Sequence, residues 1–353
     1  MVFSISHLTS LAALPFNRLL QSFTTTTPIN HQPEINQLHK KGWQHYNAEQ
    51  FEEAWFTFQQ LLHLYQSLGD EIGMGEALNQ LSLIALRSGE SAKALNCCQL
   101  ALRIAETAEN TKLLGNSLSL LGLIYQNKNQ SEHALKTYQK ALEVFVELAD
   151  EFNIGRTLNN LGAIHSTLGQ SDRAQQLCLT AAGILEAIRD QEGQATALYN
   201  AGTAYQKLGC YTQARRYLVK AQAIRTAIGD FSGEAAIATA LGEIEVQLGQ
   251  PFSAICCYQE ALDLYQELGD SHHQALTTER IAALYQQEGL PLSAFESYQT
   301  AIDLYKSSND ETGAGRALNQ LKTVYAHMGS PEYALACPSQ SIGGLETKIE
   351  MVC

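Results

Sequence analysis

The sequence has none of the short motifs on which most enzyme and metal sites are built. It contains no Cys-x-x-Cys or His-Glu-x-x-His pattern, no Gly-x-Ser-x-Gly turn and no glycine-rich phosphate loop. The 10 histidines are scattered, and the adjacent pair His272 and His273 is not part of a metal-binding helix face. We therefore predict a protein that is not an enzyme and that holds no metal and no cofactor.

Long apolar runs and basic clusters are also missing. No stretch reaches the roughly 18–20 apolar residues that a membrane-spanning helix needs. The formal net charge is -13, and lysine and arginine form no long run. An acidic chain of this kind is repelled by nucleic acid and by anionic membrane surfaces, so we expect neither as a main partner. We ascribe the acidity to solubility rather than to an acidic binding surface.

A unit of 40 residues recurs along the chain, and its best-defined copy runs from Gly115 to Asp150. Two apolar stripes of this copy have helical spacing, the first at i, i+3, i+4, i+7 and the second at i, i+4, i+7, i+11, and a polar break separates them. The stripes are Leu118, Leu121, Gly122 and Tyr125, then Ala134, Tyr138, Ala141 and Phe145. The pattern predicts two antiparallel helices per unit, A and B, which bury their apolar faces only when copies stack on either side.

Small residues and turn residues keep the same period. We expect the small residues to let helices cross closely, glycine to end helix A in a left-handed turn, and Asp or Asn to cap the next helix A. Helix B carries Ala54, Ala94, Ala134, Ala174, Ala214, Ala254, Ala294 and Ala334, and also Ala101, Ala141, Ala181, Ala221, Ala261 and Ala301. Helix A carries Gly42, Ser82, Gly122, Gly162, Gly202, Gly242 and Ala282. The turn glycines are Gly89, Gly169, Gly209, Gly249, Gly289 and Gly329, and the caps are Asp70, Asn110, Asp150, Asp190, Asp230, Asp270 and Asp310.

Cysteine usage favours a reducing compartment. The 8 cysteines include two adjacent pairs, Cys97–Cys98 and Cys256–Cys257, which are poorly placed to bridge distant elements. Cys98 and Cys178 occupy the core position that is tyrosine in other units, so we expect small buried hydrophobic residues there. We predict reduced thiols and a cytoplasmic location.

The succession of a small residue on helix A, Tyr125, Ala134, Tyr138 and Ala141 resembles the tetratricopeptide repeat signature. The 40-residue period, with joints of the form LGD-x-x-G-x-x-x-A-L-N-x-L, is similar to the longer repeats of kinesin light chain and of spindle-orientation and receptor-clustering scaffolds. The resemblance covers roughly residues 35–337, departs from the pattern at both ends, and lacks the late proline of helix B. It implies an all-α, right-handed solenoid of about eight antiparallel helix pairs whose concave surface holds a peptide or a partner helix, without catalysis.

We divide the chain into three parts. Residues 1–33 contain no Asp or Glu and form a leader, either mostly disordered or a short docking helix; a transit peptide is a minor alternative. Residues 34–337 form the solenoid, with repeats starting near Gly75, Gly115, Gly155, Ala195, Ala235, Ala275 and Gly315. Pro251, Pro291 and Pro331 stand where helix B begins. Pro338 shortens or breaks the last helix B, and residues 338–353 are either a cap over the end of the solenoid or a dimer contact.

Helix A lines the inner surface in this architecture, so the residues between its core positions face the groove. Counted from Gly115, these are the second, fifth, sixth, ninth, twelfth and thirteenth positions of each unit. Repeated Asn and Gln suit an extended peptide, because one amide both donates to and accepts from a backbone, while Arg and Glu would select charge and Tyr199 would add apolar contact. The candidate partner-binding residues are Asn79, Arg156, Asn159, Asn160, Tyr199, Asn200, Gln206, Lys207, Glu279, Arg280, Arg316 and Asn319. The same positions also yield Glu76, Gln80, Arg87, Ala283, Gln286, Gln287 and Gln320.

The predicted function is a non-catalytic interaction scaffold that binds a protein or peptide in this groove. The ninth positions of the repeats lack the Lys and Asn pattern of a chaperone carboxylate clamp, which argues against binding of a chaperone tail. Two alternatives stay open: a peptide-responsive regulatory sensor, and an assembly factor held on a membrane by residues 1–33. The sequence leaves the partner and the oligomeric state open, including a contact through the C-terminal end.

Overall fold

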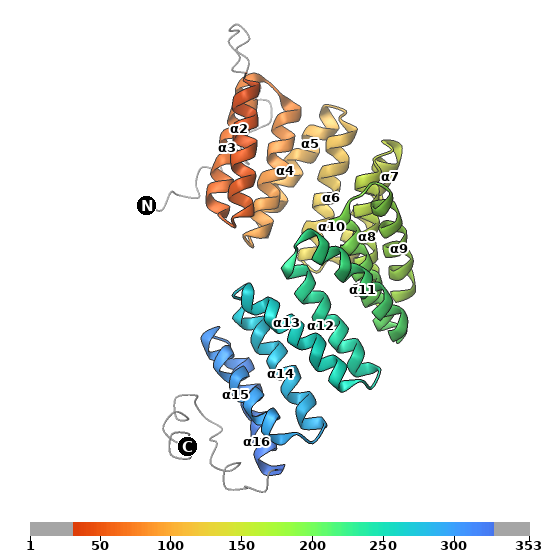
Figure 1. The fold of residues 1–353 in the computed structure, drawn as a ribbon. Coiled ribbons are helices and arrows are strands. Elements are labelled where there is room, and N and C mark those ends of the chain that lie inside the picture. The colour runs from red at the N-terminus through yellow and green to blue at the C-terminus, as the bar shows by residue number, and fades with distance from the viewer. Residues whose placement is uncertain (1–30, 328–353) are drawn as a thin grey trace. The chain divides into compact units, whose positions relative to one another are not determined.

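The computed structural model describes residues 31–327, and this part of the chain is helical throughout, with no strand (Figure 1). Neighbouring helices are joined by connections of two or three residues. The helices are α2 (Gln32–Asn47), α3 (Phe51–Leu68), α4 (Glu71–Arg87), α5 (Ser91–Thr107), α6 (Thr111–Asn127), α7 (Ser131–Glu147), α8 (Glu151–Thr167), α9 (Ser171–Ala187), α10 (Gln191–Lys207), α11 (Tyr211–Ile228), α12 (Phe231–Gln247), α13 (Pro251–Glu267), α14 (Ser271–Gln287), α15 (Pro291–Ser307) and α16 (Glu311–His327).

The chain divides into two compact units, residues 1–170 and residues 171–353. The described part of unit 1 contains α2–α8, and that of unit 2 contains α9–α16. Even-numbered helices are the A helices of the repeats and odd-numbered helices are the B helices. Within each unit, consecutive helices pack against one another as antiparallel neighbours, and successive A helices also touch directly, as α4 and α6 do in unit 1 and α10 and α12 in unit 2. Each unit is therefore a stack of antiparallel helices, and the all-α solenoid class expected from the sequence is confirmed.

The small residues of the repeat lie where helix A crosses helix B. Ala134 and Ala141 are fully buried, as are their described equivalents in the other repeats. At Gly122, an added Cβ would stand 2.7 Å from the ring of Tyr138, and at Gly242 it would stand 2.4 Å from the ring of Tyr258. These distances are far below van der Waals contact, so the aromatic ring of helix B fills the space that a side chain on helix A would need.

The repeat ends carry the predicted local signals. Asp150 Oδ1 accepts from the backbone N–H of Asn153 at 3.1 Å, which caps α8, and the equivalent Asp or Asn caps every following A helix in the same way. Gly89 has a φ of +80°, the left-handed conformation that ends helix A. Because the caps hold the first turn, α4 begins at Glu71, four residues before the expected start at Gly75.

Pro251 and Pro291 are the first residues of α13 and α15, as predicted. Residues 31–33 of the predicted leader include the start of α2 at Gln32, and the rest of the leader lies outside the described residues. The same holds for the expected short helix B of the eighth repeat, with Pro331, Ala334 and Pro338, and for the tail at 338–353.

Candidate partner-binding grooves

A groove with a volume of about 510 Å³ opens on the A helices of unit 1. We call it the unit-1 groove. Three A helices, α4, α6 and α8, supply its lining. The lining residues are Glu76, Asn79, Gln80, Leu83, Lys112, Asn116, Ser119, Leu120, Leu123, Asn153 and Asn160. The lining therefore combines amides, one hydroxyl, three leucines and one charge of each sign.

Some polar groups of the unit-1 groove are already engaged inside the protein. The side chains of Asn79 and Ser117 form a hydrogen-bonded pair, with Asn79 Nδ2 donating to Ser117 Oγ at 2.8 Å. Asn153 Nδ2 donates to Asp150 Oδ2 at 2.7 Å. These contacts fix the rim of the groove, because each joins a groove residue to a backbone-capping or buried group.

Other polar groups there have no partner within residues 31–327. The side chains of Asn116, Ser119 and Asn160 make no hydrogen bond to any described residue. Gln80 Oε1 is buried and also lacks a hydrogen-bond donor among the described residues. The half-buried side chains of Asn116, Ser119 and Asn160 therefore give the groove hydrogen-bonding capacity that a ligand can use.

Gln80 is held by a short chain of polar contacts under the groove. Its Nε2 lies 3.4 Å from His39 Nδ1, and His39 Nε2 lies 3.2 Å from the hydroxyl of Tyr65. Burial lowers the pKa of His39, against a smaller opposite effect of the Glu76 charge. A neutral imidazole has one acceptor nitrogen, and this nitrogen suits the amide of Gln80. The contact leaves Gln80 Oε1 without a donor.

Unit 2 contains a pocket with a volume of about 690 Å³, which we call the unit-2 pocket. Residues from α14, α15, α16 and the turn between α14 and α15 line it. They are Glu279, Ala283, Gln286, Gln287, Gly289, Pro291, Tyr298, Gln320 and Val324. Gln286 is engaged on both sides, since it accepts from the Tyr298 hydroxyl at 3.1 Å and donates to Thr323 at 2.8 Å.

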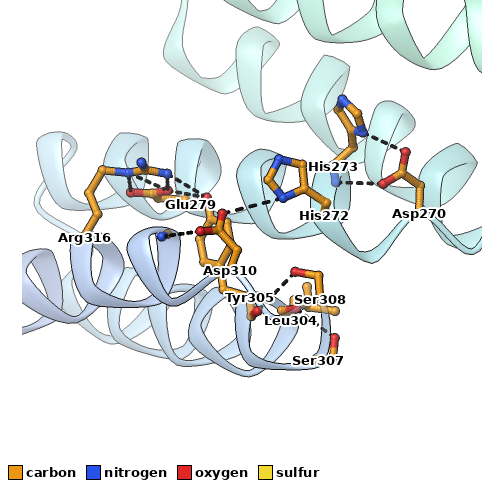
Figure 2. A network of polar contacts seen from close by, with 11 residues as sticks. Asp270, His272, His273, Glu279, Leu304, Tyr305, Ser307, Ser308, Asp310 and Arg316 are labelled. Carbon is orange, nitrogen blue, oxygen red and sulfur yellow. Dashed lines mark hydrogen bonds and ion pairs between the residues drawn. The ribbon is translucent and has the colours of Figure 1, made fainter. Parts of the chain in front are cut away.

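Glu279 of the unit-2 pocket is held by a network of its own (Figure 2). Arg316 donates to it through Nε at 3.0 Å and through Nη2 at 3.0 Å, and the Tyr305 hydroxyl donates at 2.6 Å. The Arg316 Nη2 also donates to the Tyr305 hydroxyl at 3.0 Å. Burial and the hydrogen bond to Glu279 raise the pKa of Tyr305, so its hydroxyl stays a donor. Both carboxylate oxygens of Glu279 and the Tyr305 hydroxyl are therefore hydrogen-bonded inside the protein.

A second pairing of this kind joins α10, α12 and α14, earlier in unit 2. Arg280 Nη1 is 2.6 Å from Glu243 Oε1, and Gln206 Nε2 donates to the other oxygen of Glu243 at 3.2 Å. The partners in these contacts are 37 residues apart, as are Glu279 and Arg316. The equivalent residue of the next repeat would be 40 positions on. The actual partner therefore lies about one helical turn closer to the start of its A helix than that equivalent residue. The A helices of unit 2 are thus cross-linked by side chains along their exposed face.

The joint between α13 and α14 adds further polar contacts in unit 2 (Figure 2). His273 donates its backbone N–H to Asp270 Oδ1 at 3.0 Å, and its Nδ1 is 2.7 Å from Asp270 Oδ2. His272 Nδ1 lies 3.6 Å from Asp310 Oδ2, the residue that caps α16. Burial tends to raise the pKa of Asp270, but the hydrogen bonds and charge of His273 lower it overall. These contacts stabilise the joint between the two repeats.

Only some of the predicted partner-binding residues line a cavity; others form contacts between A helices or are buried. Asn79 and Asn160 line the unit-1 groove, and Glu279 lines the unit-2 pocket. Gln206, Arg280 and Arg316 take part in the cross-links of unit 2. Asn159 is only 8% exposed, so its side chain points into the stack rather than out of it.

The remaining candidates lie on the A helices but outside both cavities. The Arg156 guanidinium covers the ring of Phe152 at 4.5 Å. Burial raises the pKa of Tyr199, whose ring is partly enclosed. Asn200 is half-buried, whereas Lys207 and Asn319 are exposed.

Our list of candidates omitted several residues that line the unit-1 groove. Asn116, Ser119, Leu120 and Leu123 occupy the second, fifth, sixth and ninth positions of repeat three, so the position rule contains the signal for them. Lys112 and Asn153 lie in the first turn of α6 and α8, ahead of the positions that the rule counted. The position rule missed these two residues because it counted each repeat from the position of Gly115, which follows the first turn of helix A, rather than from the capping residue.

Within residues 31–327, no cluster of three or more His, Cys, Asp or Glu side chains is placed to hold a metal ion. Across the same range, every helix is too short or too polar to cross a membrane.

Several solved structures share this fold. Aspartyl phosphate phosphatase F from Bacillus subtilis is 14% identical, with a TM-score of 0.59, and the match covers 90% of this chain and 94% of that chain. A Rap protein complexed with competence and sporulation factor is 12% identical, with a TM-score of 0.53 and coverage of 84% and 99%. A signal transduction ATPase with a tetratricopeptide repeat sensor, from Pyrococcus horikoshii, is 18% identical, with a TM-score of 0.59 and coverage of 78% and 43%. Identities this low show the fold alone.

Sequence comparison is more specific. No curated protein matches the sequence. The family model of soluble NSF attachment protein matches residues 245–339. The tetratricopeptide repeat model matches three overlapping or adjacent stretches, residues 73–145, 113–187 and 193–267, which together span more than half of the chain. With the helix pairs, the crossing alanines and the caps described above, this match shows that the chain belongs to the tetratricopeptide repeat family.

Proposed function

We propose that this protein is a non-catalytic interaction scaffold that binds a segment of a partner protein across its A helices. Tetratricopeptide arrays present a preformed surface on stacked helices, and this architecture supports protein-interaction scaffolds and sensors in general. The unit-1 groove carries the proposal, because the side chains of Asn116 and Ser119 on α6 and of Asn160 on α8 have no hydrogen-bond partner among the described residues. Preformed polar groups of this kind bind a backbone without first breaking internal contacts.

A photo-crosslinking amino acid tests the proposal. Placed at Asn160, on the groove, it should form crosslinks to a partner protein in cells. Placed at Lys140, an exposed residue of helix B in the same unit, it should form none. The double substitution Asn116→Ala with Asn160→Ala should weaken capture of the same partner by about tenfold, as expected for the loss of two hydrogen bonds of roughly 0.5–1.5 kcal/mol each. Equal crosslinking from both positions would refute binding in the groove.

A peptide-responsive sensor is the second candidate. It is favoured by the fold shared with a Rap protein that was solved in complex with competence and sporulation factor. A sensor must change its conformational equilibrium when the peptide binds. Small-angle scattering with and without a bound peptide distinguishes the two, since a scaffold keeps its radius of gyration and a sensor changes it.

A further inference from the structure

The two cavities differ in how much of their polar surface is already used. In the unit-2 pocket, Glu279 is satisfied by Arg316 and Tyr305, and Gln286 by Tyr298 and Thr323. A ligand that contacts Glu279 or Gln286 must break internal hydrogen bonds to make new ones, so the net gain is small. The two amides there that make no hydrogen bond to a described residue, Gln287 and Gln320, are exposed and already solvated. In the unit-1 groove, the half-buried side chains of Asn116, Ser119 and Asn160 are available without that cost. The unit-1 groove is therefore the better ligand site.

The charged residues of the lining limit which ligands the unit-1 groove can bind. The lining of the unit-1 groove includes one acidic residue, Glu76, and one basic residue, Lys112, and the other lining residues are neutral. Both charged residues are exposed, whereas the amides and leucines of the lining are half-buried. A charged ligand side chain placed over this half-buried part would lose its water without meeting an opposite charge, which is unfavourable. The groove therefore selects against charge in the part of the ligand that it covers.

Three leucines define an apolar contact within the same groove. Leu83 comes from α4, and Leu120 and Leu123 come from α6. All three are partly exposed although they belong to the faces that line the groove. Covering them with an aliphatic side chain removes apolar surface from water on both sides, at about 25 cal/mol per Å².

The spacing of the helices indicates the form of the ligand backbone. Packed helices are about 8–10 Å apart, and an extended chain rises about 3.3 Å per residue, so roughly three residues pass from one A helix to the next. Since α4 and α6 touch directly whereas α6 and α8 pack less closely, a segment that crosses α4, α6 and α8 is at least about seven residues long. Its backbone N–H and C=O groups meet amides that both donate and accept. Resting on the function proposed above, we propose that the unit-1 groove binds an extended, uncharged segment of a partner protein that places one aliphatic side chain against Leu83, Leu120 and Leu123.

The test uses a capped peptide library of about seven varied positions, selected against the full chain. The peptides recovered should carry Leu, Ile, Val or Met at one position, and Asp, Glu, Lys and Arg should be depleted beside it. Leu123→Ala should weaken the best of these peptides about fivefold, which corresponds to roughly 1 kcal/mol.

Introducing a carboxylate into each cavity in turn shows which of the two cavities binds the peptide. Ser119→Asp introduces a charge into the unit-1 groove at a side chain that makes no hydrogen bond to a described residue. It should shift the selection towards peptides with Lys or Arg, because the new charge gains a partner only from them. Gln320→Glu introduces the same charge at an exposed residue of the unit-2 pocket and should leave the selection unchanged. Circular dichroism confirms that both variants fold.

The outcomes separate this inference from the proposed function. Selection of charged peptides, or a selection that responds to Gln320→Glu and not to Ser119→Asp, would overturn the inference and leave a scaffold that binds elsewhere. Failure to enrich any peptide, together with equal crosslinking from Asn160 and Lys140, would overturn both.

Discussion

Replacing Gly122 by alanine tests the packing that gives each repeat its geometry. Alanine is a better helix former than glycine by about 1 kcal/mol, so in an exposed helix the change is stabilising. At Gly122 the new Cβ would lie 2.7 Å from Cδ1 and Cε1 of Tyr138 and 2.9 Å from Cζ. The ring is fully buried, and its hydroxyl donates to Gln126 Oε1 at 3.2 Å, so it cannot swing away freely.

The size of the effect follows from two opposing contributions. Forcing one extra carbon into a packed core costs about 1–3 kcal/mol, which exceeds the gain in helix propensity. Repeat seven shows that the backbone can adapt, since the buried Ala282 stands opposite the buried Tyr298. We therefore expect Gly122→Ala to destabilise the protein by about 1 kcal/mol net.

Gly183→Ala is the matched control. Gly183 is an exposed residue of α9, and a Cβ added there meets no atom within 4 Å. It should stabilise the protein by about 1 kcal/mol, because only the propensity changes. Urea unfolding followed by circular dichroism measures both variants. If both alanines raise the unfolding midpoint equally, the close approach of helix A to Tyr138 does not limit packing, and the argument fails.

Three further predictions concern the cross-links, the caps and the buried thiols. Glu279→Gln should lower the free energy of unfolding by about 1–2 kcal/mol, because Arg316 loses its ionised acceptor. The decrease should be smaller in concentrated salt, and the same urea assay should show no change for the exposed control Glu288→Gln. Asp150→Ala should cost about 1 kcal/mol and speed amide exchange in the first turn of α8, whereas Asp150→Ser should retain most of the cap. Alkylation of the native protein, read by peptide mass spectrometry, should label Cys210 and Cys256 and spare three buried thiols, Cys97, Cys98 and Cys178.

The buried thiols also make stability depend on pH. Burial raises the pKa of Cys178 to about 12 from an ordinary value of 9.0. The unfolded chain releases this proton first, so the contribution to stability is complete below pH 9.0 and is lost as the pH rises towards about 12. Thermal midpoints should fall over this range, and less steeply in Cys178→Ala. A midpoint that rises with alkaline pH would contradict the reasoning.

The sequence by itself determined the repeat and its local structure. The helix pair, its period, the small crossing residues and the Asp caps depend on spacings within 40 residues and on side-chain size, which the sequence states directly. Gly122 and Tyr138 illustrate this, because their 16-residue separation brings a small residue opposite a large one in adjacent helices. The same position rule also placed Asn79, Asn160 and Glu279 on the two cavities.

Only the tertiary structure decided which of these side chains have partners. Glu279 pairs with Arg316, 37 residues on, rather than with the equivalent residue of the next repeat, because neighbouring A helices are offset by about one turn. Asn159 and Asn160 are adjacent in sequence but about 100° apart around the helix, so one is buried and the other lines the groove. Offset and rotation are set by how whole helices pack, and this information is not contained in the spacing of residues along a single helix.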